Sequence, residues 1–543
     1  MHRPPAAGPR LATATVIAAC VVLTGCASTN QRNATPSVQG LDGMVSDEAA
    51  SAGGGPAGTQ SATGSANGDS SPTGSASGAA TGGDSTATAG VDGTSGARGG
   101  ADATTTDAGE GTQPSTGAGA GAGSTGPSTP GSGATSSPSN DVAMGPGVTA
   151  DTITLGFQWA EDLQAGFAIV GASGDPADEE AMSVALVNWL NANGGIRGRR
   201  VEAVSHGTNA ANGSWAAQAQ AACATFTEDN TSFAVVSSAV GGDDSLLACL
   251  AEKDTPLVET NLWLFDRQYY HEYPDLLYRP GNMVADVWVR ALVDGLAKIG
   301  YFEGATVGLL RFDAPVFDRL ADNVMLPALA EYGIHPEVAE IGSPNSVADF
   351  GSSGSQMANA VVRFRAAGVT HVLMLENAGI MPFLFMQEAE AQGYRPVYGL
   401  SSADIPTTQA GQQEPAQLAG AVGIGWTPPN DVPHGDNPGG NPHYDTCRQI
   451  LSDAGLTNLT GFYAQSRCDA VFFLKAAMEA APDLTRAGLA AGVAGMGDSY
   501  LSPFTMGSSF GPGKPDGADV VRPFAFVDEC ACFRYTHSPY AIR

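Results

Sequence analysis

Every aromatic residue of the chain lies after residue 147, and this break in composition decides which part of it can fold. Between Ala27 and about Gly145 the sequence is almost entirely Gly, Ser, Thr, Ala, Pro and Asp, with few aliphatic residues. Such a segment cannot bury enough apolar surface to offset the conformational entropy lost on ordering. We therefore predict a disordered tether over residues 26–146. The roughly 400 residues from Val148 to Arg543 suit two folded domains.

The N-terminus has the charged, apolar and small-residue order of an export signal. Arg3 and Arg10 precede the apolar stretch Leu11–Leu23, which at about 13 residues is shorter than a membrane-spanning helix. Leu23-Thr24-Gly25-Cys26 resembles the end of a bacterial lipoprotein signal, in which the cysteine is lipidated and becomes the first residue. We predict a signal peptide over 1–25 and a lipid anchor at Cys26 that holds the protein on the extracytoplasmic face of the cell membrane. An ordinary secretory signal with a chance cysteine is the alternative.

The charge of the chain excludes one class of partner. A net charge of −30 disfavours nucleic-acid binding, because nucleic-acid phosphates have to be met by Lys and Arg. After the signal, no other apolar stretch approaches spanning length, so a channel is also disfavoured. We interpret the acidity as a source of solubility.

The cysteines agree with export. Of the eight, Cys20 would leave with the signal and Cys26 would be lipidated, so six remain, an even number that suggests disulfides in an exported chain. Neighbours in sequence are the simplest pairs. These are Cys223 with Cys249 and Cys447 with Cys468.

Cys530 and Cys532 are a harder pair. Residues i and i+2 of a strand lie roughly 6.5 Å apart, near the upper limit for a disulfide, so this bridge requires a bend at Ala531. Zinc is the rival, but paired Cys-x-x-Cys motifs and a nearby His cluster are both missing from the sequence. We expect no metal.

Short apolar segments alternate with amphipathic helices from Thr152 onward, which predicts α/β layers with right-handed crossovers. The expected strands are Thr152–Phe157, Arg200–Val204, Phe233–Ser237, Pro256–Glu259, Thr306–Arg311, Glu337–Ile341, His371–Leu375, Pro396–Gly399 and Ala421–Gly425. The expected helices include Glu179–Ala192, Val284–Ile299, Ala314–Tyr332, Gln356–Ala367 and Pro382–Gln392.

Several segments occur in the order found in one known family. Gly147–Thr149 leads into the first strand, and the helix after it ends in Asn193-Gly194-Gly195-Ile196 before the basic strand start Arg199-Arg200. Later segments are Phe233–Val236, Thr255–Val258, Leu277–Pro280, Phe510–Gly513 and Phe524–Asp528. From about Gly147 to the C-terminus the chain resembles the type I periplasmic-binding fold, in the branch of leucine/isoleucine/valine-binding proteins of ABC importers. The cysteine pattern and the Gly/Ala-rich composition are similar to those of actinobacterial members.

The resemblance implies two doubly wound lobes joined by three crossovers. Lobe one would hold residues 147–280 and 432–512, and lobe two residues 281–431 and 513–543. The ligand would lie in the cleft between the lobes, against the carboxyl ends of the strands, where open α/β sheets bind their ligands.

Polar and aromatic residues follow the expected strands at those ends. They are Trp159; Ser237 and Ser238; Glu259, Thr260 and Asn261; Phe312 and Asp313; Glu376 and Asn377; and Ser401, Ser402 and Asp404. Trp159 could cover a ligand or pack between the lobes. The hydroxyls of Ser237 and Ser238 stand before a helix start that suits an anion, although Asp243 and Asp244 would oppose one and suit N-caps instead.

Three departures from the family pattern leave the ligand open. The acidic residue that members use for a ligand ammonium falls near Ser401, their tyrosine near Asn377, and a hydroxyl-bearing residue near Trp263. Glu259, Glu376 or Asp404 could supply the charge instead. Members of the family also bind amides, urea-like molecules and aromatic acids.

The sequence offers no support for an enzyme. It contains no Gly-x-Ser-x-Gly elbow after a strand, no His-Glu-x-x-His and no P-loop, and its histidines are scattered singly. We expect no catalysis and no cofactor. The expected function is a lipid-anchored solute-binding protein that closes on a small polar molecule and delivers it to an ABC permease. A sensor or interaction lipoprotein with the same fold is the rival, and an extracytoplasmic enzyme is a weaker one.

Overall fold

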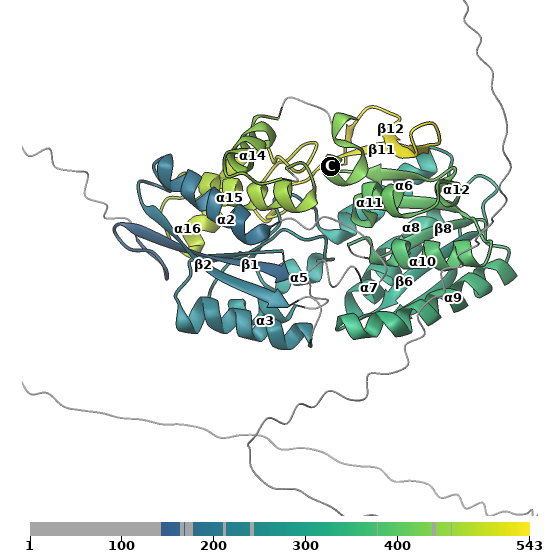
Figure 1. The fold of residues 1–543 in the computed structure, drawn as a ribbon, viewed down its shortest axis with the longest axis horizontal. Helices are drawn as coiled ribbons and strands as arrows, with labels where there is room; N and C mark the ends of the chain where they lie inside the picture. Colours follow the sequence, from purple (N-terminus) through teal and green to yellow (C-terminus); the bar gives the residue numbers. More distant parts are fainter. Residues whose placement is uncertain are drawn as a thin grey trace, which may run out of the picture. The chain divides into compact units, whose positions relative to one another are not determined.

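The strands of the described chain form two sheets, of five and eight strands. The computed structural model describes residues 143–162, 168, 178–209, 213–238, 244–376, 378–436, 441–457 and 459–542, all within the compact unit Gly126–Arg543. Figure 1 shows this part of the chain. Cys26, the predicted signal peptide, the predicted tether up to residue 142 and Asn377 lie outside the described residues.

The smaller sheet has parallel strands in the order β2-β1-β3-β4-β5. They are β1 (Thr152–Glu161), β2 (Arg200–Asn209), β3 (Ala234–Ser237), β4 (Leu257–Glu259) and β5 (Leu277–Tyr278). One core cluster joins this sheet to α2 (Glu179–Ala192), α14 (Pro442–Asp453), α15 (Phe462–Ala480) and α16 (Arg486–Met496). A second joins it to α3 (Trp215–Ala224), α4 (Ser245–Glu252) and the segment before α5 (Arg267–Glu272). Helices therefore cover both faces, as buried parallel strands require.

The larger sheet repeats this winding and extends it. Its order is β12-β11-β10-β9-β8-β6-β7, with β13 paired to β11. The parallel strands are β6 (Val307–Asp313), β7 (Glu337–Gly342), β8 (His371–Leu375), β9 (Val397–Ser401) and β10 (Val422–Gly425). The antiparallel strands are β11 (Val520–Val527), β12 (Cys532–Tyr535) and β13 (Tyr540–Ala541).

The helices of the larger sheet pack around one extended core. They are α6 (Ala285–Lys298), α7 (Pro315–Leu320), α8 (Leu326–Glu331), α9 (Phe350–Ala366), α10 (Ile380–Ala391), α11 (Pro406–Gln412) and α12 (Pro415–Leu418). The short helix α13 (Pro428–Asp431) follows β10 and contacts α11. Figure 1 shows α9 and α10 beside β6 and β8, and α2, α15 and α16 beside β1 and β2.

The chain passes between the two sheets three times: after β5, after β10 and after α16. The predicted α/β class with two doubly wound lobes is confirmed. Within the described residues, no helix combines the length and apolarity needed to cross a bilayer.

The expected strands are all present, but some are longer than their apolar runs. β1 and β2 stay paired in register as far as Glu161 and Asn209, because polar residues continue the ladder beyond the apolar segment. The helix expected over Ala314–Tyr332 is interrupted, since a π-helical stretch over Ala321–Met325 separates α7 from α8. The hairpin β11–β12 was not expected.

Three disulfides join the predicted neighbours among the described cysteines: Cys223–Cys249, Cys447–Cys468 and Cys530–Cys532. The last pair brings its Cα atoms to 5.1 Å, closer than the spacing along a flat strand. Ala531 between them has φ +47°, so the chain does bend there.

The segment after β4 contributes to both halves of the molecule. Leu264 belongs to the core of the larger sheet, whereas Phe265 belongs to a core cluster of the smaller sheet. Asp266, only 3% exposed, accepts a hydrogen bond from Arg319 Nε of α7 at 2.5 Å. Leu264 and Asp266, which follow the predicted ligand-binding residues at the end of β4, thus contact the half of the molecule that contains the larger sheet.

Candidate functional site

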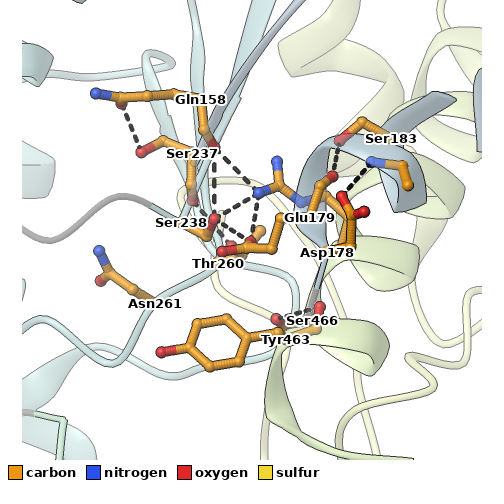
Figure 2. A network of polar contacts seen from close by, with 12 residues as sticks. Gln158, Asp178, Glu179, Ser183, Ser237, Ser238, Thr260, Asn261, Tyr463 and Ser466 are labelled. Carbon is orange, nitrogen blue, oxygen red and sulfur yellow. Dashed lines mark hydrogen bonds and ion pairs between the residues drawn. The ribbon is translucent and has the colours of Figure 1, made fainter. Parts of the chain in front are cut away.

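The switch point of the smaller sheet lies between β1 and β3, where the strand order reverses and open α/β sheets form their crevice. Gln158 of β1 and Ser237 of β3 are partners in the strand register. The Ser237 hydroxyl donates to Gln158 Oε1 at 2.9 Å, and Gln158 Nε2 donates to the Thr208 hydroxyl of β2 at 2.9 Å. These side chains tie three adjacent strand ends together, as Figure 2 shows for Gln158 and Ser237.

A buried ion pair lies against this edge. Arg467 of α15 donates through Nη2 to Glu179 Oε2 at 2.5 Å and to the Gln158 carbonyl at 3.0 Å, and also to the Ser238 hydroxyl. Glu179 is the first residue of α2. Asp178 caps this helix, because its side chain accepts a hydrogen bond from the backbone N–H of Ala181. Ser238 in turn donates to Glu179 (Figure 2). The side chains of Arg467 and Glu179 are 0% and 1% exposed.

This network has unused hydrogen-bonding capacity. Among the described residues, the buried atoms without a partner include Arg467 Nε and Nη1 and Glu179 Oε1. Burial raises the pKa of Glu179, while Arg467 and Ser238 oppose that rise. Burial, followed by the charge of Glu179, also raises the pKa of the neighbouring Tyr463. Buried polar groups in folded proteins are normally paired, so these donors call for an acceptor from beyond the described residues.

The end of β4 lies next to this network. Glu259 Oε1 accepts from the backbone N–H groups of Thr260 and Asn261 at 3.0 and 3.1 Å. Burial raises the pKa of Glu259 to about 7. The Thr260 hydroxyl donates to the Ser237 carbonyl at 2.9 Å, and the Asn261 carbonyl accepts from Arg279 at 2.7 Å. The side chain of Glu259 is therefore already engaged by the turn that follows it.

The predicted aromatic residues take packing positions. Trp159 is 7% exposed and belongs to a core cluster of the smaller sheet. Phe312 is buried in the core of the larger sheet, with its ring 5.4 Å from that of Phe317. Asp313 follows it at the end of β6 and is exposed.

The end of β9 in the larger sheet is a cluster of buried polar groups. Asp404 Oδ2 accepts from the backbone N–H of Ser401 at 2.6 Å and from its hydroxyl at 2.8 Å, in a capping box. The Ser402 hydroxyl donates to Asp431 Oδ1 at 2.7 Å and accepts from the backbone N–H of Trp426 at 2.7 Å. Burial raises the pKa of both Asp404 and Asp431 to about 7.

Glu376, at the end of β8, adds another carboxyl group to this edge. It accepts from the backbone N–H of Gly379 at 3.0 Å, and burial together with the charge of Asp404 raises its pKa well above the usual value. Gln409 Nε2 bridges the carbonyls of Gly379 and Asp404 at 3.0 and 2.9 Å. Asp404 Oδ1 and Gln409 Oε1 are among the described buried atoms without a partner.

The predicted residues thus fall into two groups. Ser237, Ser238, Glu259, Thr260 and Asn261 gather at the edge of the smaller sheet, and Ser401, Ser402 and Asp404 gather at the edge of the larger one. Across the described ranges, no cluster of three or more His, Cys, Asp or Glu side chains suits a metal ion.

Sequence reasoning missed the residues that complete both groups. They are Arg467, Glu179 and Gln409. The Arg467–Glu179 pair spans 288 positions, whereas Gln409 lies 5 positions from Asp404 and 30 from Gly379. One signal was available: Arg467 stands in a helix whose following residues are largely apolar, and a charge in such a helix is rarely buried without a partner. No such signal was present for Glu179, because acidic residues are common in the first turn of a helix.

Solved structures with the same fold come from several bacteria. A possible leucine/isoleucine/valine-binding protein from Rhodopirellula baltica aligns with a TM-score of 0.53 at 13% identity, covering 72% of this chain and 97% of that one. A solute-binding protein of an ABC transporter from R. palustris, in complex with 4-hydroxybenzoate, aligns with a TM-score of 0.52 at 14% identity, covering 72% and 97%.

A branched-chain amino acid transporter substrate-binding protein from Streptococcus pneumoniae, in complex with isoleucine, aligns with a TM-score of 0.51 at 13% identity, covering 71% and 99%. At such identities the likeness concerns the fold. A search of curated proteins gave no match. The family profile described as periplasmic binding protein matches residues 168–528. The chain therefore belongs to the periplasmic binding protein family.

Proposed function

We propose that this protein is a lipid-anchored, extracytoplasmic solute-binding protein of an ABC importer. It captures a small polar organic molecule between its two lobes and closes around it. The observation that carries the proposal is the buried guanidinium of Arg467, which has free donors at the switch point of the smaller sheet. Leaving a buried polar atom unpaired costs about 1–3 kcal/mol and more for a charged group, so a ligand that supplies the acceptor gains that free energy.

The two sheet edges favour a ligand with both acceptor and donor groups. Arg467 at one edge has spare N–H groups, whereas Asp404 and Gln409 at the other have spare oxygen acceptors. An amino acid, an amide or a hydroxylated acid offers both kinds of group. This is consistent with the isoleucine and 4-hydroxybenzoate named for the structural relatives.

In this proposal, two sets of residues face the ligand. Those of the smaller sheet are Ser237, Ser238, Glu259, Thr260 and Asn261, joined by Arg467, whereas Trp159 packs in the core of that sheet. Those of the larger sheet are Asp313, Ser401, Ser402 and Asp404, whereas Phe312 packs in the core and Asn377 lies outside the described residues. The lobes comprise residues 147–280 with 432–512, and 281–431 with 513–543. A ligand that touches both lobes stabilises the closed form through its higher affinity for that form, and the permease recognises the closed form.

A thermal-shift screen tests ligand capture. The purified protein is screened against amino acids, amides, polyols and aromatic acids, and a true ligand stabilises the fold by about 2.7 kcal/mol at a hundredfold excess over Kd. Arg467→Lys should bind any hit at least tenfold more weakly, because an ammonium lacks the planar donor set of a guanidinium. Arg200→Lys, at an exposed position, is the matched control. A broad panel without a single shift would contradict ligand capture and favour an interaction protein.

The anchor and the coupling to transport need separate tests. Cys26→Ala should move the protein from the membrane fraction to the medium and abolish incorporation of labelled fatty acid. If the variant stays with the membrane, Cys26 is not the anchor. Deletion of the gene should abolish uptake of the ligand found in the screen. Unchanged uptake would favour a sensor over an importer component.

A further inference from the structure

The three described disulfides differ in exposure. Cys447 and Cys468 are both 0% exposed, so their bridge is fully buried, whereas the second bridge joins the 0% exposed Cys223 to the half-buried Cys249. Cys530 is exposed and Cys532 half-buried, at the turn between β11 and β12. A dissolved thiol can therefore reach the Cys530–Cys532 bridge without any unfolding.

The bridges also differ in what they contribute to stability. Cys223–Cys249 and Cys447–Cys468 join residues 26 and 21 positions apart, whereas Cys530–Cys532 spans only 2. The restriction that a cross-link places on the unfolded chain grows with the length of the loop it closes. The short bridge therefore adds little to global stability, so the fold does not depend on keeping it oxidised.

The short bridge has a local effect instead. It encloses Ala531, whose φ of +47° lies in the left-handed region that residues with a Cβ seldom adopt. Opening the bridge removes the covalent constraint on this conformation. The turn is then free to relax toward an ordinary backbone geometry.

The turn is connected to the candidate site through β12. Phe533 is buried in the core of the larger sheet, and the Tyr535 hydroxyl donates to Asp431 Oδ2 at 2.8 Å. Asp431 accepts through its other oxygen from Ser402, a predicted ligand-binding residue. Only two hydrogen bonds separate the strand that begins at Cys532 from the polar cluster at the end of β9.

We propose that Cys530–Cys532 is a reversible thiol–disulfide exchange site whose partner is a dithiol, such as the reduced form of an exported thiol oxidoreductase. A thiolate of the dithiol attacks Sγ of Cys530, the more exposed sulfur. The Cys530–Cys532 bond breaks, and Cys532 leaves as a thiolate that takes up a proton. The second thiol of the partner then resolves the mixed disulfide. Cys530 is released as a thiol, and the two electrons have passed from the partner, now a disulfide, to the protein.

Graded reduction of the folded, oxidised protein tests this site. Dithiothreitol serves as the probe dithiol, free thiols are trapped with iodoacetamide, and peptides are quantified by mass spectrometry. We expect Cys530 and Cys532 to be trapped at least tenfold faster than the four cysteines of the other two described disulfides. Equal rates overturn the proposal, and so does trapping of Cys530 and Cys532 before any reductant is added.

Paired variants separate this site from the structural disulfides. Cys530→Ser/Cys532→Ser should leave the thermal midpoint within about 2 °C of the parent, whereas Cys447→Ser/Cys468→Ser should lower it by about 4 °C or more. A large loss from the first variant would make its bridge structural and overturn the proposal. Hydrogen exchange at residues 528–535 should rise at least threefold on selective reduction. Unchanged exchange would show that the bridge does not shape the turn.

Discussion

The two sheets wind in the same order but carry opposite polarity at their carboxyl edges. The order β2-β1-β3-β4-β5 of the smaller sheet is repeated as β7-β6-β8-β9-β10 in the larger one. At the first edge, Arg467 is paired with Glu179 and keeps unused N–H groups. At the second, the carboxyl groups of Glu376 and Asp404 lie close enough for one charge to act on the other, and Asp404 keeps an unused oxygen.

This difference shows how one scaffold acquires two chemistries. The strands determine where side chains meet at the carboxyl edge of each sheet. The charged side chains at that edge come from the helices and turns that pack against it. Arg467 belongs to α15, which packs on the smaller sheet only after the chain has returned from the larger one. Asp404 belongs to the short turn directly after β9. The complementary polarity suits a ligand with an acceptor at one end and a donor at the other.

The largest effect is expected from removing the cation of the smaller sheet. Arg467→Met leaves Glu179 buried without its partner, which should lower the free energy of unfolding by about 3–5 kcal/mol. Urea denaturation measures this loss. Adding Glu179→Gln to the Arg467→Met variant should recover part of it, since the unpaired charge is then gone.

The exposed Arg200 provides the control for this change. Its ion pair with Glu202 lies at the surface, where such pairs contribute about 0–1 kcal/mol. Arg200→Met should therefore have little effect. If Arg467→Met lowered the free energy of unfolding as little as Arg200→Met, the buried Arg467–Glu179 pair would not stabilise the edge of the smaller sheet in the way described.

A smaller effect is expected from pH at the edge of the larger sheet. Burial raises the pKa of Asp404 from 3.8 to about 7, so the folded state binds this proton more tightly than the unfolded state does. The resulting stabilisation is complete below the unfolded pKa and is lost as the pH rises through about 7. The free energy of unfolding should therefore fall by about 2 kcal/mol or more between about pH 5 and pH 8.

Denaturation of Asp404→Asn across the same pH range assigns this slope. The variant should show a shallower decrease, because the titrating carboxyl group is gone. Asp313→Asn, an exposed position at the end of β6, should keep the parental slope. If stability rises with pH in the parent, the buried acids of the larger sheet are not protonated in the way described.

The smallest effect is expected where the two halves meet through aromatic side chains. Trp215 of α3 is 4% exposed, and its ring lies 6.3 Å from that of Phe350 in α9 and 6.5 Å from that of Trp263. Phe350→Leu keeps an apolar side chain but removes the ring pair, so a loss of about 1 kcal/mol is expected. Chemical denaturation followed by tryptophan emission measures the free energy of unfolding. Val362→Ala, at a 58% exposed position of the same helix, should have less effect. If Val362→Ala lowered the free energy of unfolding as much as Phe350→Leu, the contact between Phe350 and Trp215 would contribute no specific stabilisation.

Local pattern was sufficient to predict most of the scaffold. The strand His371–Leu375 and the helix Glu179–Ala192 have the expected bounds. An apolar run and a capped amphipathic pattern are both visible in residues that are adjacent in the sequence. The polar continuation of β2 to Asn209 was missed because its partner strand, rather than its own hydrophobicity, keeps it extended. The hairpin at Cys530–Cys532 was missed for a related reason, since it is defined by pairing with β11.

The candidate site was predictable only in part. Ser237 and Ser401 are the last residues of two apolar strands and Ser238 follows the first of them, and these positions are visible in the sequence. The partners that give these residues their chemistry come from distant segments. Arg467 reaches Ser238 across 229 positions, and no periodicity encodes such a contact. Polar residues at a strand end can thus be found from the local sequence, whereas the charged residue that contacts them depends on the whole topology.

The segment after β4 has a mechanical consequence. Asn261 stands at the edge of the smaller sheet, and a few residues later Leu264 is embedded in the core of the larger one. The segment therefore ties the edge of the smaller sheet to the core of the larger one over a few residues, in addition to the three crossovers.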